Sequence, residues 1–209
     1  MLLPRLALAL AVGVAAAPAL AQPEGPVIGS EQAVSEQART LFQQGLGFAD
    51  RGDWERAVER FRHALELRDT PNVRYNLAQS LAQMGRLVEA LEELDRVLSF
   101  ESASDDVREA ATSLKADLQP RLGHLLIRVN EELEGSQVTI DGRPIGSPRP
   151  PGNVATDPGV RVVRLLRDAE ELDVEEVDVP EGGEASVVLE VPPALRAVRL
   201  ATATDRPEP

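Results

Sequence analysis

The hydrophobic positions in the first half of the chain recur with a helical period, and the pattern repeats after 33 residues. The segment from Leu41 to Leu67 matches the segment from Arg74 to Phe100, with Gly52 corresponding to Gly85. A period of this length, with glycine in the turn and small residues where helices cross, predicts stacked helical hairpins. Such stacks leave a grooved surface free and typically bind other proteins.

The helical pattern is interrupted by residues that favour helix ends, and these interruptions predict five helices. Gly52 suits the position just after a helix, and Asp53 is a good N-cap for the next one. Pro71 suits the first position of a helix, because the N–H it lacks would have no partner there. Pro120 ends the last helix. The predicted helices span 30–51, 54–67, 71–84, 87–100 and 104–119, with Ser30, Thr70 and Ser104 as further N-caps.

After Leu122 apolar and polar positions alternate, which is the period of a strand with one buried face. Asp141-Gly142 and Gly182-Gly183 have the composition of tight turns. Residues 153–159 are expected to form a loop. Several short antiparallel strands in about 70 residues predict a small β-sandwich. The predicted strands span 124–130, 136–141, 160–166, 172–179 and 185–191.

The change of period divides the chain into a helical domain, residues 30–119, and a β domain, residues 122–192. The predicted fold class is therefore multidomain α and β, with about five helices in tandem hairpins followed by a small antiparallel β-sandwich. The junction from 120 to 123 is expected to join two cores that unfold separately. Residues 193–209 offer little to pack and are expected to form a disordered tail.

The first 21 residues have the layout of a cleaved secretory signal: Arg5, an apolar run, and small residues before Gln22. A retained membrane anchor is the rival interpretation, but the run from Leu6 to Ala21 is shorter than the ~20 apolar residues of a spanning helix. Residues 22–29 predict a flexible linker. Because the chain has no cysteine, it lacks the residue that is modified in a lipoprotein. We expect no integral membrane anchor after cleavage.

Acidic residues outnumber basic residues by 35 to 22, and the formal net charge is −13. Loss of the predicted signal removes Arg5 and changes this charge to −14. Such a surface repels phosphate groups, which argues against a nucleic-acid partner and against docking on anionic lipids. The signal, the acidity and the preference for Arg over Lys together indicate a periplasmic or secreted bacterial protein.

The repeated segments resemble the tetratricopeptide repeat family in the order of their small and large residues. Gly45 and Ala57 fall where paired helices approach closely, and Phe48 and Phe61 fall at aromatic positions. The period is 33 rather than the usual 34, and Val97 replaces an Ala. Further matches are Leu41 and Ala64 in the first repeat and Leu77, Ala78, Leu81, Ala90 and Leu94 in the second. The resemblance covers two repeats and a capping helix.

The β segment resembles the PEGA domain, a small β-sandwich of bacterial envelope proteins. Residues 133–150 contain Asp-Gly followed by Gly-x-Pro in the order of that family. Pro158-Gly159 begins a second matching element, and residues 180–183, Pro-Glu-Gly-Gly, correspond to its last turn. The glycine–aromatic pair usual after the central strand is missing. Together with the export signal and the repeats, the resemblance implies a protein of the Gram-negative envelope.

The chain carries no pattern typical of an enzyme. His63 and His124, its two histidines, fall outside any zinc-protease or nucleophile-elbow motif. Paired carboxylates such as Glu92-Glu93 could serve a glycosidase, but adjacent residues on a helix point in different directions. Calcium-loop and phosphate-loop motifs are also missing from the sequence. We therefore expect no catalysis, no cofactor and no metal.

The tetratricopeptide resemblance places the first helix of each hairpin on a concave face that binds a protein or peptide partner. Phe42, Leu46 and Tyr75 would provide apolar contacts, and Arg39 and Asn76 could hydrogen-bond a peptide backbone. Alternatively, Phe42 and Leu46 pack under the N-terminal segment or the fifth helix. Because these two positions carry Lys and Asn in the carboxylate-clamp variant of the family, capture of a free C-terminus is not expected. The implied lining residues are Arg39, Phe42, Leu46, Asp50, Asn72, Tyr75, Asn76, Gln79 and Gln83.

The leading hypothesis from the sequence is a non-catalytic periplasmic scaffold. An alternative is an envelope-polymer binder that contacts peptidoglycan or polysaccharide through the β domain. Sugar sites usually contain stacking aromatics, and the sequence has none from Leu122 onward. Residues 142–152 could be either a proline-rich ligand for another domain or a hairpin arm followed by an ordered loop.

Overall fold

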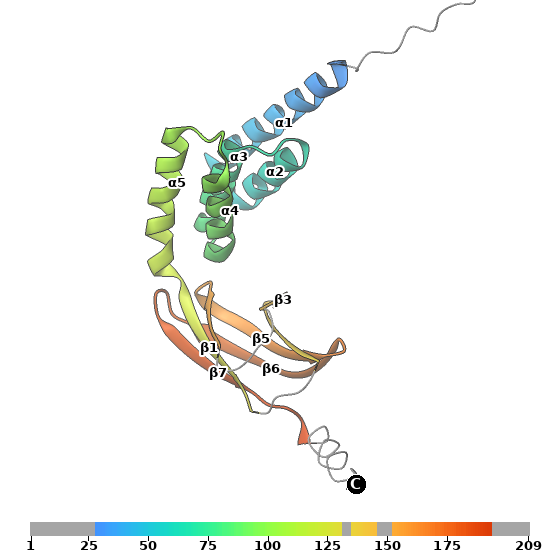
Figure 1. The fold of residues 1–209 in the computed structure, drawn as a ribbon, viewed down its shortest axis with the longest axis vertical. Helices are drawn as coiled ribbons and strands as arrows, with labels where there is room; N and C mark the ends of the chain where they lie inside the picture. Colours follow the sequence, from blue (N-terminus) through green and yellow to red (C-terminus); the bar gives the residue numbers. More distant parts are fainter. Residues whose placement is uncertain (1–27, 131–134, 146–151, 194–209) are drawn as a thin grey trace, which may run out of the picture.

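The computed structural model describes residues 28–130, 135–145 and 152–193, and Figure 1 shows helices followed by a β-sandwich. The expected fold class is confirmed. The expected signal, most of the linker, residues 146–151 of the proline-rich segment and residues 194–209 lie outside the described residues. The helices are α1 (Ile28–Ala49), α2 (Trp54–Leu67), α3 (Pro71–Gln83), α4 (Leu87–Ser99) and α5 (Asp105–Leu118), followed by a 3-10 turn, η1 (Gln119–Arg121).

The two hairpins, α1–α2 and α3–α4, have the same turn. Gly52 and Gly85 both have a φ of +73°, in the left-handed region that glycine adopts without strain. In each turn the residue after the glycine donates its amide proton to the carbonyl five residues earlier, at 3.0 Å. The 33-residue repeat of the sequence is therefore a repeat of backbone hydrogen bonding.

Small residues allow the paired helices to pack closely, as the sequence predicts. A Cβ at Gly45 would lie 2.5 Å from Cε1 of Phe61, so only glycine fits beside that ring. Phe61 itself is fully buried. The fully buried residues of this helical core include Ala57, Phe61, Ala64, Ala78, Leu87, Ala90, Leu94, Val97 and Ala111.

The helix ends differ from expectation in detail. α1 begins at Ile28, so Ser30 lies inside the helix rather than capping it, and α1 ends at Ala49 rather than at residue 51. Asp53 caps α2, and its carboxylate accepts a hydrogen bond from the Arg56 amide at 3.4 Å. Thr70 and Ser104 occupy N-cap positions, but their side chains form no capping hydrogen bond.

The sandwich consists of a three-stranded sheet, ordered β4-β1-β7, and a four-stranded sheet, ordered β3-β2-β5-β6. The pairing of β1 with β7 is parallel, so the expectation of antiparallel strands is wrong for this pair. The cause is the connection after β6, which crosses to the other sheet instead of forming a hairpin. The strands are β1 (Gly123–Val129), β2 (Ser136–Ile140), β3 (Arg143–Pro144), β4 (Gly152–Thr156), β5 (Gly159–Arg167), β6 (Glu170–Val179) and β7 (Glu184–Leu189).

The expectation of a loop over 153–159 is also wrong. Most of it belongs to β4, which pairs antiparallel with β1. β4 is a short strand at the edge of its sheet, and its one buried residue, Thr156, is polar, so it lacks the apolar alternation that reveals a strand. The Asp141-Gly142 turn is confirmed. Both residues have positive φ, at +49° and +79°, as a tight β2–β3 hairpin requires.

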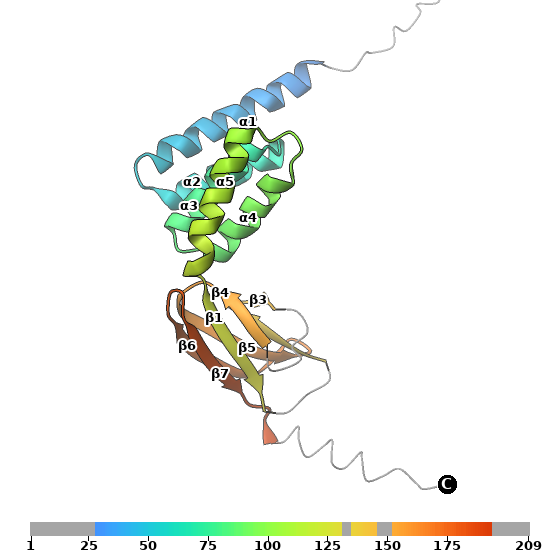
Figure 2. The same cartoon turned by 60° about the vertical axis from the view of Figure 1, so that its left-hand side comes forward.

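The sandwich has its own core, separate from that of the helices. Figure 2 shows α5 leading through η1 into β1, so that the helices stand on one end of the sandwich. Within the described ranges, no helix is both long and apolar enough to cross a membrane. The core residues are Leu125, Ile127, Val138, Ile140, Val163, Leu165, Val179, Val187, Leu189 and Val191.

Candidate protein-binding groove

A groove of about 470 Å³ lies between α3 and α5. α3 contacts both α1 and α5, so the first helices of the two hairpins and the capping helix are neighbours. Figure 2 shows α5 passing in front of the hairpins. The lining residues are Trp54 from the start of α2, Gln79, Ala82 and Gln83 from α3, and Leu114, Asp117, Leu118 and Arg121 from α5 and η1.

Local structure positions the polar side chains of α3. Gln79 and Gln83 are exposed one turn apart on this helix. The Gln79 amide donates to the Tyr75 hydroxyl at 3.1 Å, so Tyr75 helps to orient it. The Asn76 amide donates to the backbone carbonyl of Asn72 at 2.8 Å and is thereby turned onto its own helix.

Trp54 contributes an apolar wall at the first position of α2. The preceding turn at Gly52 and the cap at Asp53 fix the start of this helix. Leu114 faces the same groove from α5. Large aromatic residues with one polar atom are favoured in binding surfaces, because they combine apolar area with a directional hydrogen-bond donor.

The structure does not bring all the expected lining residues into this groove. Phe42 packs on Phe61, with ring centroids 5.8 Å apart, and Leu46 also lies against the helical core. Both are half-buried. Phe42 thus packs on α2 within the first hairpin. Of the residues implied by the sequence resemblance, Gln79 and Gln83 line the groove itself.

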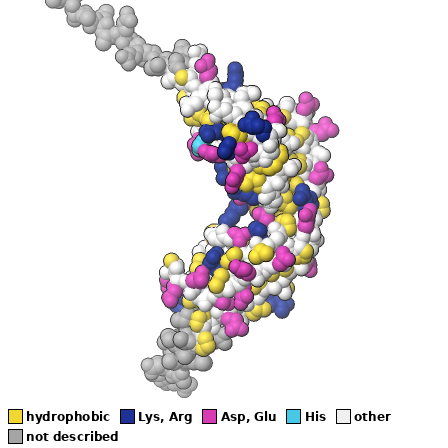
Figure 3. Space-filling model, turned by 180° about the vertical axis from the view of Figure 1, so that it is seen from behind, with side chains coloured by type: hydrophobic (Ala, Val, Ile, Leu, Met, Phe, Trp, Pro, Cys, Tyr) yellow, Lys and Arg dark blue, Asp and Glu magenta, His cyan; other side chains and the backbone are white. Residues whose placement is uncertain are grey.

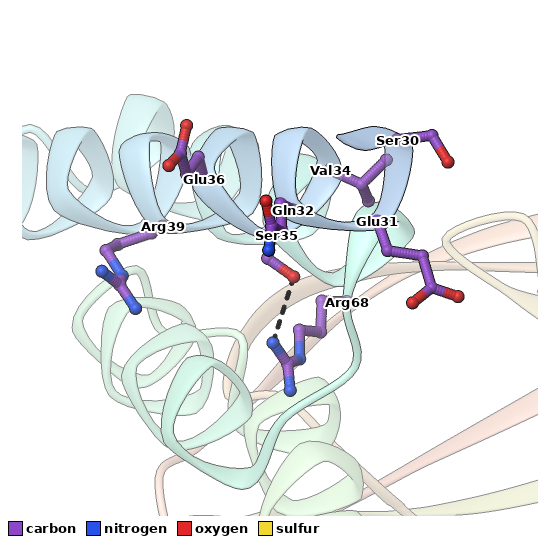
Figure 4. A pocket seen from close by; sticks show the side chains of 8 residues that line it. All are labelled: Ser30, Glu31, Gln32, Val34, Ser35, Glu36, Arg39 and Arg68. Atoms are coloured by element: carbon purple, nitrogen blue, oxygen red, sulfur yellow. Dashed lines mark hydrogen bonds between the residues drawn. The ribbon is translucent and has the colours of Figure 1, made fainter. Parts of the chain in front are cut away.

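Arg39 lies elsewhere, beside an open cavity of about 710 Å³ at the N-terminal end of α1. Figure 4 shows Arg39 and Arg68 extending into the same space, one from α1 and one from the residue after α2. Arg68 donates to the Ser35 hydroxyl at 3.2 Å. The cavity beside Arg39 and the groove that Gln79 lines have no lining residue in common.

Charged groups mark one end of the groove. Asp117 is exposed on α5. Arg121 follows in η1, and its Nε atom donates to Glu181 of the β half at 2.6 Å. The groove thus combines two amides and two apolar walls with a charged end next to the sandwich. Amide side chains can both donate to and accept from a peptide backbone, which suits them to binding extended chains.

The sequence did not predict the groove residues that α5 contributes. Their position depends on how α5 packs on α3, which the repeat does not encode. A signal for Trp54 was present, since it is the single tryptophan of the chain and stands directly after the first turn.

The two histidines of the chain lie far apart in the described fold. His63 lies half-buried on α2, and His124 lies on β1 opposite Glu184, so the two histidines lie in different halves of the molecule. Over the described ranges, no three His, Asp or Glu side chains form a group that could hold a metal ion.

A comparison with curated proteins found no match. A comparison with family models matched residues 48–118 to the tetratricopeptide repeat. The matched segment runs from the end of α1 through α5 and includes most of the residues that line the groove. In this segment the chain is thus similar to a family whose members typically bind proteins.

Proposed function

We propose that the protein is a non-catalytic adaptor that binds a protein or peptide partner in the groove between α3 and α5. The observation that carries this proposal is the composition of the groove: exposed amides of Gln79 and Gln83 beside the apolar side chains of Trp54 and Leu114. The tetratricopeptide match over residues 48–118 supports it independently.

The bound segment would lie along α3. Gln79 and Gln83, one helical turn apart, would hydrogen-bond its backbone, and an apolar side chain of the partner would pack between Trp54 and Leu114. Buried aromatic anchors usually dominate such interfaces, so Trp54 is expected to be the main one. Tyr75 would act indirectly, by orienting the Gln79 amide.

A pull-down from envelope extract with the Trp54→Ala/Gln83→Ala variant tests this assignment. The variant should lose its partner while keeping the helical circular dichroism of the wild type. Glu66→Ala, on the exposed surface of α2, is the matched control and should retain the partner. If the folded double variant captures the same proteins as the wild type, the groove assignment is wrong.

The proposed location is the bacterial periplasm or the extracellular space, with the β half acting as a PEGA-like module. The signal-like residues 1–21 and the absence of cysteine support export without lipidation. Intact mass spectrometry of the exported protein should give a chain that begins at Gln22. A retained segment 1–21 would argue for a membrane anchor instead.

Envelope-polymer binding through the β half is the weaker candidate. A shallow cavity of about 310 Å³ lies on the outer face of the sheet that contains β1, beside His124 and Leu126. None of the described residues that line this cavity is a Trp, Tyr or Phe, the rings on which sugars usually stack. Co-sedimentation of the purified protein with purified cell wall, in the absence of the partner that binds the groove between α3 and α5, would support this candidate.

A further inference from the structure

The second hairpin lacks a capping side chain of its own. Asp53 caps α2 in the first repeat, and the matching position before α4, 33 residues later, is Arg86. Arginine has no acceptor, and no side chain of its own hairpin caps α4. The first N–H groups of a helix have no partner within it, so those of α4 are open to water or to an acceptor from another part of the chain.

The β half supplies that acceptor. Asp157, in the link between β4 and β5, accepts a hydrogen bond from the Val88 amide at 2.8 Å. The Leu87 amide also interacts with this carboxylate. A carboxylate in this position satisfies two amides of the first turn and lies at the positive end of the helix dipole. It takes the place that Asp53 has in the first repeat.

The strands on either side of Asp157 set its position. The preceding residue, Thr156, is buried and pairs with Gly123 in the sheet, and Gly159 follows at a φ of +97°. Charged groups surround the contact. On the helical side these are Glu89 and Arg86, which pair with each other, and on the β side Arg161, which pairs with Asp141 at 2.8 Å.

A second attachment lies at the junction of the two halves. The turn between β6 and β7, residues 180–183, packs on η1, and the Gly182 amide donates to the Arg121 carbonyl at 3.1 Å. Gly182 has a φ of +67°, and a Cβ there would lie 2.8 Å from the Pro120 carbonyl oxygen. The side chain of Glu181 pairs with Arg121. Glycine is therefore required at 182 both by conformation and by contact.

We propose that Asp157, from the β half of the same chain, caps the N-terminus of α4, and that this contact and the 180–183 turn together fix the orientation of the sandwich on the helical repeats. One contact alone would allow the sandwich to pivot. Two contacts, on the start of α4 and on the residues after α5, define its orientation. Arg143 of β3 adds an ion pair to Glu92 of α4 at 3.2 Å, and both residues line a cavity between α4 and the β half. Figure 3 shows the surface hollowed between the two halves.

Hydrogen exchange in the full-length protein tests the cap. In Asp157→Ala the protection of the Val88 amide should fall about fivefold, the effect expected for loss of a helix cap. Asp157→Asn is the matched control and should keep the protection, because asparagine caps about as well as aspartate. Unchanged exchange in Asp157→Ala would overturn the proposal.

Distance measurement tests the orientation. The natural chain has no cysteine, so spin labels on Glu66→Cys of α2 and Glu176→Cys of β6 report a single distance between the halves. We expect a narrow distribution in the parent and a broader one in Asp157→Ala. Adding Arg86→Asp to Asp157→Ala should return a cap to α4 but leave the distribution broad. A narrow distribution in either variant would show that Asp157 does not fix the orientation.

A variant that leaves Asp157 intact keeps the proposal testable if Asp157→Ala does not fold. Gly182→Ala disturbs only the second attachment, and it should broaden the same distance distribution while the Val88 amide remains protected. An unchanged distribution in Gly182→Ala would refute the two-point attachment, whatever the result at Asp157.

Discussion

At the scale of single residues, glycine and phenylalanine determine how closely α1 and α2 pack. Gly45→Ala places a Cβ 2.5 Å from the buried ring of Phe61, and the ring cannot move without disturbing the core. We expect a loss of about 1–3 kcal/mol in the free energy of unfolding, the usual cost of overpacking. Urea denaturation followed by circular dichroism measures it.

Gly47→Ala is the control for that prediction on the same helix. A Cβ at Gly47 meets only the end of the flexible Arg51 side chain, at 3.7 Å. Removal of a helical glycine should then stabilise the protein by roughly 0.5–1 kcal/mol. Equal effects of the two substitutions would contradict the close packing of Gly45 on Phe61.

The carboxylate of Asp157 gives a prediction about pH. Burial raises its pKa above the ordinary 3.8, and hydrogen bonds from Val88 and Leu87 and the charge of Arg161 only partly oppose the effect, while Glu89 adds to it. Because the folded protein holds this proton more tightly than the unfolded chain, the contribution of Asp157 to stability decreases as pH rises from about 4 through the raised pKa. At still higher pH the contribution stays constant.

Urea denaturation of the wild type and of Asp157→Asn across this pH range measures the effect. Asparagine has no proton to release here, so the stability of the wild type relative to the variant should fall as pH rises. A wild type that gains stability relative to Asp157→Asn over the same range would show that the hydrogen bonds outweigh burial and lower the pKa.

At the scale of helices and strands, local chemistry was readable from the sequence and long-range pairing was not. Gly52, Asp53 and Pro71 act within a few residues of their own positions, so the sequence predicted their turns and helix ends. The strand β4 has too few apolar residues to be recognised, and its partner β1 lies far away in the sequence. The parallel β1–β7 pair and the α5 wall of the groove depend on similarly distant contacts.

The α3–α4 hairpin gives a prediction at this scale. Arg74 of α3 binds both oxygens of Asp69 at 2.7 Å and also pairs with Glu93 of α4. The hydrogen bond to Asp69, and then the bond and charge of Glu93, hold the pKa of Arg74 above its ordinary value despite burial. The side chains of Arg74 and Glu93 are only 14% and 12% exposed, so loss of Arg74 would leave Glu93 poorly compensated.

We therefore expect Arg74→Met to lower the free energy of unfolding by about 1–3 kcal/mol. Arg96→Met is the matched control, because Arg96 pairs with the same Glu93 but is 54% exposed. An exposed ion pair contributes at most about 1 kcal/mol, so this variant should change little. Chemical denaturation measures the free energy of unfolding of both variants. Equal losses would mean that the burial of the Arg74–Glu93 pair does not contribute to stability.

At the scale of the whole molecule, two hydrophobic cores are joined by contacts that are mostly polar. The helical core and the sandwich core share no described residue, and the polar contacts between α4 and the β half include those of Asp157 and Arg143. Interfaces of this kind allow each core to unfold by itself. Their polar contacts still couple the two halves, because α4 takes its cap from the other core.

This coupling is tested by comparing the effect of one substitution, Arg86→Asp, in the isolated helical half and in the full chain. The fragment 28–121 retains every buried residue of the helical core but loses Asp157, so α4 begins without a side-chain cap. We expect it to be helical but less stable than the same segment in the full chain.

Arg86→Asp should raise the stability of the fragment by about 1 kcal/mol, since it restores the cap that Asp53 provides in the first repeat. In the full chain the same substitution should give no gain, because Asp157 already caps α4 and a second carboxylate would repel it. Thermal unfolding of all four proteins by circular dichroism makes the comparison. An equal gain in both contexts would mean that Asp157 does not cap α4, and a fragment without helical signal would mean that the sandwich is needed to complete the helical core.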